Sequence, residues 1–198
     1  MVSKHFEDIK IKFTDDTDTT AQIIAEPFER GYAVTIGSAL RRTLMTSVPG
    51  AAIVSIKIDG IDHEFSSING ILEDISDVVL NLKEVIFKTL HDGPEQVSLS
   101  LEGPMEFRAQ HIADKITDFE ILNPEHLIAT LNKKAKLNID IRIARGKGYS
   151  NAKKNKRSDD VIGTIPMDSI FNPISNVAWS VEPIATSIEG EERLIMSV

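Results

Sequence analysis

The histidines are the side chains of this sequence best suited to hold a metal ion or to move a proton. His63 and Glu64 begin like the helical zinc-protease motif, which requires a second histidine four residues after the first. No histidine stands at that position. The chain also has no cysteine, which excludes disulfides, thiolate metal sites and a cysteine nucleophile. We therefore interpret His63 as a structural or interface residue and expect no metal site.

Two further patterns invite comparison with known catalytic or binding sites. Arg145-Gly146-Lys147-Gly148 alternates basic residues with glycines, but its spacing fits neither the dinucleotide fingerprint nor the Walker motif. Glu73 and Asp74 are adjacent, so on a helix they diverge by about 100° and cannot share one substrate. A small hydrolase built around His63 is the remaining enzymatic alternative, and it lacks a catalytic constellation. We expect no catalytic residue and no cofactor.

The composition indicates a globular protein whose net charge disfavours binding to nucleic acids. Hydrophobic residues make up 41% of the 198 residues, which is enough for a core without disulfides. The net charge of −8 disfavours nucleic-acid binding, because phosphate contacts require a surplus of Lys and Arg. The N-terminal residues do not resemble a signal peptide, and no segment is apolar enough to span a membrane. We expect a cytoplasmic protein without direct DNA contact.

Alternation of apolar and polar residues dominates the chain and predicts strands. Ile9, Ile11 and Phe13 alternate with lysines, which predicts a half-buried strand. Residues 85–90 and 96–102 flank a His-Asp-Gly-Pro breaker, so they are predicted to pair as a hairpin. Further strands are expected at residues 54–58, 137–143 and 193–198.

Two helices interrupt the strands. The first is predicted at residues 36–48, with Thr35 as its N-cap and Pro49-Gly50 as its stop. The second is predicted at residues 72–82, with Glu73 and Asp74 at the positive end of the helix dipole. The apolar residues of each helix share one face: Ile36, Leu40, Leu44 and Val48 in the first, and Ile75, Val78, Val79 and Leu82 in the second.

The stretch at residues 145–160 differs from the rest because it is basic and almost without apolar residues. We interpret it as a mobile, solvated loop. A nucleic-acid-binding module that uses this loop is an alternative interpretation, and the acidic charge of the whole chain argues against it. Strands dominate, helices are few and their order is mixed, which predicts an α+β protein.

The most informative segment runs from Glu26 to Gly50. It contains a Glu-Arg-Gly turn, then Gly-x-x-Leu-Arg-Arg-x-Leu, then Pro-Gly. With Leu40 facing inward, Arg41 and Arg42 are expected on the outer side of the first helix. Arginine is a preferred interface residue because its guanidinium binds carboxylates and carbonyls in a fixed geometry. This segment resembles the signature of the α subunit of bacterial-type DNA-directed RNA polymerase.

Three more segments agree with this resemblance, in the order of the family and from about residue 20 to the C-terminus. The His-Glu-Phe and Leu-Asn-Leu-Lys segments favour the bacterial or plastid type over the archaeal and eukaryotic relatives. The matching segments are residues 58–65 with 70–75 and 80–83, residues 145–149, and residues 162–168 with 172–174 and Val177.

The resemblance implies a two-part architecture and a role in assembly. A dimerisation subdomain would combine residues 1–50 with 174–198, and a mostly β subdomain at 51–173 would be inserted into it and contribute subunit contacts. In this family two α subunits pair first, and the dimer then recruits the β subunit and afterwards the β′ subunit. The chain would therefore be a non-catalytic subunit of a nucleotidyltransferase that acts in transcription.

The resemblance also implies which residues make the contacts. The first helix takes part in α pairing, so Ile36, Leu40 and Leu44 are the expected dimer contacts. Arg42 corresponds to the position most closely tied to β binding. The other expected subunit contacts are Arg41, Met45, His63 and Lys83, with Met167 and Ile174 at positions implicated in joining β′.

The chain departs from the family pattern at its C-terminal end. The family usually continues beyond Val198 into a long helix that completes the dimer interface, and then into a domain that contacts promoter DNA. Either the chain is a fragment, or pairing depends on the first helix and the neighbouring strands. The sequence leaves both interpretations open.

Overall fold

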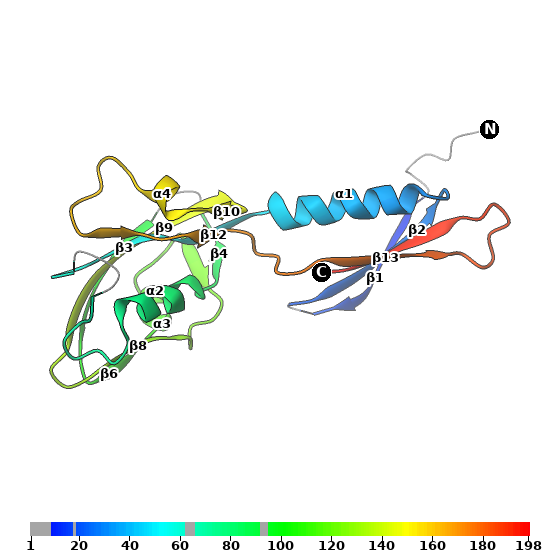
Figure 1. Cartoon of the computed structure of the whole chain (residues 1–198). Helices are drawn as coiled ribbons and strands as arrows, with labels where there is room; N and C mark the ends of the chain where they lie inside the picture. The colour runs from blue at the N-terminus through cyan, green and yellow to red at the C-terminus, as the bar shows by residue number, and fades with distance from the viewer. Residues whose placement is uncertain (1–8, 18, 62–65, 92–94) are drawn as a thin grey trace. The chain divides into compact units, whose positions relative to one another are not determined.

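The computed structural model describes residues 9–17, 19–61, 66–91 and 95–198, and it has the expected strand-dominated α+β fold (Figure 1). Two compact units are present: Met1–Val48 with Pro173–Val198, called the first unit here, and Pro49–Asn172, called the second unit. The elements, in chain order, are β1 (Lys10–Asp16), β2 (Ala21–Phe28), α1 (Tyr32–Thr46), β3 (Pro49–Ile58), α2 (Ile75–Lys83), β4 (Phe87–Thr89), β5 (Glu95–Glu102), β6 (Met105–Arg108), α3 (Gln110–Ala113), β7 (Phe119–Ile121), β8 (Leu127–Leu131), β9 (Lys136–Lys147), β10 (Tyr149–Ser150), α4 (Ala152–Asn155), β11 (Thr164–Pro166), β12 (Ser169–Ile170), β13 (Ala178–Pro183) and β14 (Glu192–Ser197).

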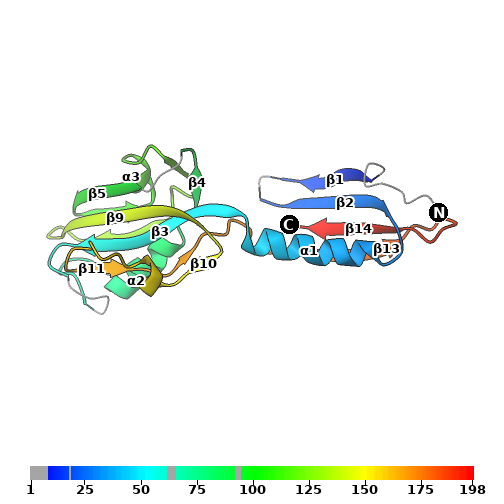
Figure 2. The ribbon, with the colours of Figure 1, turned by 90° about the horizontal axis from the view of Figure 1, so that it is seen from above.

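The first unit is an antiparallel sheet with one helix on it. The strand order is β1-β2-β14-β13, so the two chain segments of this unit meet where β2 pairs with β14. Helix α1 packs on β13 and β14, and Figure 2 shows β1 at the edge of the sheet away from the helix. The small core between the helix and the sheet contains Phe28, Ala33, Val177, Leu194 and Met196.

The second unit contains the larger core. Its main sheet has the order β5-β9-β3-β4-β7, with β11 also paired to β3. Alternate residues of β9 are buried, as the period-two pattern predicts, whereas residues 53–56 of β3 are buried without alternation. Helix α2 packs on β3 and β8 through its predicted stripe of Ile75, Val78, Val79 and Leu82.

Both predicted helices exist, but their first residues differ from the prediction. Helix α1 begins at Tyr32 rather than residue 36, so Thr35 is not its N-cap. Gly31 occupies that position with φ +83°, a left-handed conformation that glycine adopts without strain, and its N–H donates to Glu192 Oε2 at 2.9 Å. Helix α2 begins at Ile75 rather than residue 72, after the extended N-cap residue Asp74, and Ile71 forms a bridge with Leu131 of β8.

Three strand and loop predictions were wrong. Strands β4 and β5 do not form a hairpin, since β4 pairs with β3 and β7 while β5 pairs with β9. Strand β1 is exposed along its whole length rather than half-buried. The stretch at residues 145–160 is folded, because it contains the end of β9 together with β10 and α4.

Candidate subunit interface

Helix α1 lies close to its sheet because small residues face the strands. Ala33 is fully buried, and a Cβ atom on Gly37 would lie 2.9 Å from side-chain atoms of Leu194 and Trp179. Only glycine permits this approach without displacing one of those side chains. Two of the predicted dimer contacts, Ile36 and Leu44, are half-buried against the same core.

Leu40 is placed differently from the expectation. It lies between Ile36 and Leu44 on the same helix face, but 44% of its surface is exposed. The expectation that Leu40 faces inward is therefore wrong for the single chain. The helix makes its closest contact at Ala33 and Gly37, so the part of this face that carries Leu40 is left partly uncovered.

The first unit also has uncovered apolar surface on β1. Residues that pair directly across a sheet share a face, and the register aligns Phe13 with Ile23, Met196 and Trp179 in one row. A second row joins Ile11 to Ala25, Leu194 and Val181. Helix α1 covers the β14 and β13 ends of these rows, whereas Ile11 and Phe13 at the β1 end are 63% and 61% exposed.

The two arginines of α1 have different surroundings. Arg41 Nε donates a hydrogen bond of 2.9 Å to the carbonyl of Val177, which links the helix to the segment before β13. Arg42 is exposed on the helix surface. Met45, the third predicted contact on α1, is half-buried against the first-unit core. Of the three, Arg42 is the side chain best placed to meet a partner.

The remaining predicted contacts do not form one cluster. Ile174 packs half-buried in the first unit, whereas Lys83 is exposed at the end of α2 in the second unit. Met167 is only 2% exposed and lies in the second-unit core, with its N–H donating to the carbonyl of Val54. A buried side chain cannot contact a partner directly, so any contribution of Met167 to subunit binding acts through the packing of the second-unit core. His63 lies outside the described residues.

Lys83 lines a small cavity of about 190 Å³ in the second unit together with Tyr149 and Asp168. Partial desolvation of the hydroxyl raises the pKa of Tyr149 above its usual value, and the negative charge and hydrogen bonding of Asp168 raise it further. Asp168 also accepts a hydrogen bond of 2.7 Å from the backbone N–H of Ala152. These contacts tie α4 to β12 and fix the shape of the cavity beside Lys83.

The glycines of the Arg-Gly-Lys-Gly run have structural roles. A Cβ atom on Gly146 would lie 2.6 Å from the ring of Phe171, so this position must be glycine for the ring to pack on β9. Gly148 has φ +60° in the turn between β9 and β10.

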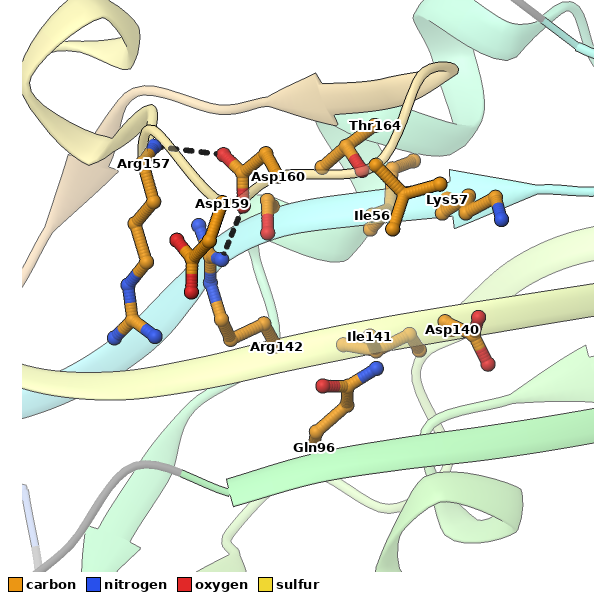
Figure 3. A pocket seen from close by; sticks show the side chains of 12 residues that line it. Ile56, Lys57, Gln96, Asp140, Ile141, Arg142, Arg157, Asp159, Asp160 and Thr164 are labelled. Atoms are coloured by element: carbon orange, nitrogen blue, oxygen red, sulfur yellow. Dashed lines mark hydrogen bonds and ion pairs between the residues drawn. The ribbon is translucent and has the colours of Figure 1, made fainter.

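A buried ion pair holds the segment after β10 in place. Arg142 Nη1 donates to Asp160 Oδ1 at 2.6 Å, and the two side chains are only 13% and 9% exposed (Figure 3). Burial would raise the pKa of Asp160, but the hydrogen bonds from Arg142 and from the backbone of Arg157 outweigh it and lower that pKa. The carboxylate is therefore ionised at neutral pH.

The described part of the chain shows no group of three or more histidine, aspartate and glutamate residues that could hold a metal ion. The rings of two described histidines contact the backbone instead. His126 Nε2 lies 2.9 Å from the carbonyl of Asn81, and His111 Nδ1 lies 3.1 Å from the backbone of Arg108. Within the same residues, no helix is both long enough and apolar enough to cross a bilayer.

A comparison with protein families decides the relationship. The sequence profile described as RNA polymerase Rpb3/RpoA insert domain matches residues 55–172, which form nearly all of the second unit. The chain belongs to this family.

Individual relatives extend the similarity to the first unit. The chain is 50% identical over 193 residues to a protein named DNA-directed RNA polymerase subunit alpha from Prosthecochloris aestuarii, which covers 97% of the chain and 59% of the relative. Proteins of the same name from Chloroherpeton thalassium and Salinibacter ruber are 53% and 46% identical over 81% and 90% of the chain, and over 49% and 55% of their own lengths. The chain thus spans about half the length of the curated relatives it matches.

Sequence reasoning missed the uncovered edge of the first unit. The alternation of Ile9, Ile11 and Phe13 predicts an apolar face. Ile9 packs on the first-unit core, whereas Ile11 and Phe13 in β1 are exposed. Their exposure depends on which strands α1 covers, and no local pattern carries that information.

Proposed function

We propose that this chain is a non-catalytic assembly subunit of DNA-directed RNA polymerase that acts in the cytoplasm. It pairs with a second copy of itself, and the pair then binds the β subunit followed by the β′ subunit. The similarity to relatives named DNA-directed RNA polymerase subunit alpha supports the assignment of the chain to this complex. The observation that carries the pairing is the exposed apolar strip formed by Ile11, Phe13 and Leu40 in the first unit.

The apolar burial available at this strip is comparable with the cost of association. Burial of a large apolar side chain contributes about 1.5–3 kcal/mol, and a symmetric interface counts each side chain twice. Burial of these three residues on both copies would contribute a free energy of the same order as the cost of association, which is about 4–15 kcal/mol for the lost translational and rotational freedom. The remaining strip area on α1 and β2 adds to this gain.

The pairing is tested by light scattering on the double variant Phe13→Asp with Leu40→Asp. We expect a dimer for the unchanged chain and a monomer for the variant, because the two carboxylates would have to be buried in the interface. Ser180→Asp is the matched control, since Ser180 is exposed on β13 and its row faces the other side of the sheet. A monomeric unchanged chain at micromolar concentration, or a dimeric double variant, would contradict the proposal.

The second step is tested by retention on immobilised β subunit. Arg42→Ala is expected to weaken retention about tenfold or more, as truncation of an exposed interface arginine does. Lys133→Ala, in the exposed turn between β8 and β9, is the control. Two copies bound per β subunit, with retention reduced only by Arg42→Ala, support the proposal. One copy per β, or equal retention of both variants, argues against it.

A further inference from the structure

A second surface feature lies in the second unit, apart from the predicted dimer strip. A cavity of about 300 Å³ opens between β9, β10 and α4. Its described lining contains five basic side chains and no carboxylate. In a chain with a net charge of −8, such a concentration of positive charge is local and unexpected. The basic residues of the lining are Arg142, Arg145, Lys147, Lys154 and Arg157.

Part of the positive charge of the cavity belongs to exposed side chains. Arg142 is not among them, because it has a buried carboxylate partner, Asp160, and it also donates to the carbonyl of Asn155 at 3.0 Å. Arg157 contacts Asp160 through its backbone N–H, and Figure 3 shows its guanidinium directed away from that carboxylate. Lys147 and Lys154 are exposed. The cavity therefore has a surplus of cations that would be stabilised by an anionic ligand.

The frame of the cavity is held by packing and hydrogen bonds, although its sequence suggested a mobile loop. Gly146 packs against the ring of Phe171, which forms part of the lining and is 6% exposed. Asn155 donates to the carbonyl of Met167 at 2.7 Å and accepts from Ser150 at 2.8 Å. These contacts position α4 and the backbone that carries Lys154 before any ligand arrives, which lowers the entropic cost of binding.

The surroundings of the cavity favour a protein ligand over a nucleic acid. Tyr149 lines the cavity and pairs with Ile170 across β10 and β12, and these neighbours are 62% and 72% exposed. Exposed apolar side chains beside a charged cavity are typical of a protein interface with its apolar contact and charged rim.

We propose that this cavity is a docking site for an acidic segment of a partner protein. Aspartate or glutamate side chains of the segment would bind Lys147, Lys154 and Arg157, and an adjacent apolar residue would pack on Tyr149 and Ile170. Charge-assisted hydrogen bonds from Lys and Arg to carboxylates supply the polar part of such an interface. The site is independent of the dimer strip and of Arg42.

The test uses fluorescence anisotropy at low salt with the full chain and a short labelled peptide that alternates aspartate with leucine and serine. The variant Lys147→Gln with Lys154→Gln removes two charges of the cavity. The variant Lys133→Gln with Lys134→Gln is the matched control, because both residues are exposed in the turn before β9, at the opposite end of that strand. A peptide with asparagine at every aspartate, and single-stranded DNA of equal length, are the comparison ligands.

We expect the acidic peptide to bind, to lose at least about tenfold in affinity with the cavity variant, and to keep its affinity with the control variant. The asparagine peptide is expected to bind more weakly than the acidic one. The proposal is overturned if the acidic peptide shows no binding, if both variants lose affinity equally, or if the DNA binds more tightly and depends on the same two lysines. Thermal unfolding of each variant confirms that the fold is intact.

Discussion

Single residues determine how the basic segment of the second unit folds. Arg142 and Asp160 are eighteen positions apart, and their ion pair has no counterpart in any periodic sequence pattern. The same segment also depends on Gly146, whose missing side chain makes room for Phe171. A sequence that is polar throughout can therefore be ordered when one buried charge pair and one close packing contact fix both of its ends.

The ion pair leads to a prediction for Asp160→Asn. Removal of one partner of a buried pair leaves the other charge uncompensated, so we expect a loss of about 3 kcal/mol in the free energy of unfolding at pH 7. Urea unfolding followed by circular dichroism measures this loss. Asp159→Asn, at the exposed neighbouring residue, is the control and should change stability by less than about 0.5 kcal/mol.

The pH dependence of the same variant tests the cause. The pKa of Asp160 is lowered in the folded state, so its stabilising effect is complete above the unfolded pKa of about 3.9 and is lost as the pH falls through the lower folded value. The difference between the unchanged chain and Asp160→Asn should therefore be constant near neutral pH and shrink in acid. A difference that stays constant down to strongly acidic pH would exclude the ion pair as its source.

Secondary-structure elements were predictable where periodicity decides them. The α2 stripe and the alternation of β9 depend on local spacing, and the structure confirms both. The partners of β4 and β5 were not predictable, because each strand pairs with strands distant in the sequence and not with the other. The first residue of α1 was missed because the left-handed turn at Gly31, held by Glu192, replaces an ordinary cap.

The start of α2 gives a prediction at this scale. Glu73 Oε1 accepts from Thr130 Oγ1 at 2.9 Å and its Oε2 accepts from the Thr130 N–H at 2.6 Å, which ties the helix start to β8. Asp74 occupies the N-cap position without a side-chain hydrogen bond. Glu73→Ala should therefore cost about 1–3 kcal/mol, and Asp74→Ala less than about 0.5 kcal/mol, in urea unfolding. Equal losses would instead support the helix-dipole interpretation of both carboxylates.

For the whole molecule, the sequence resemblance indicated an inserted domain, and the structure contains two units with separate cores. The assignment of one unit to dimerisation and of the other to subunit contact stays a prediction. The candidate contacts could be assigned only through the resemblance, because exposure and packing arise from the complete fold. Met167 illustrates this, since its apolar character suits a core and an interface equally well.

The separate cores predict that the second unit folds alone. Its chain is continuous from Pro49 to Asn172. Its two ends are close together because both contact the end of β9: Pro49 pairs with Lys147, and the N–H of Phe171 donates to the carbonyl of Gly148, the next residue, at 2.8 Å. A fragment of residues 49–172 should unfold in urea in one cooperative transition, at the midpoint of one of the two transitions expected for the full chain. A fragment that begins at Gly60 loses β3, which pairs with β4, β9 and β11, and should show no cooperative transition. If residues 49–172 also failed to unfold cooperatively, the second-unit core would depend on the first unit, and the two units could not be treated as independent domains.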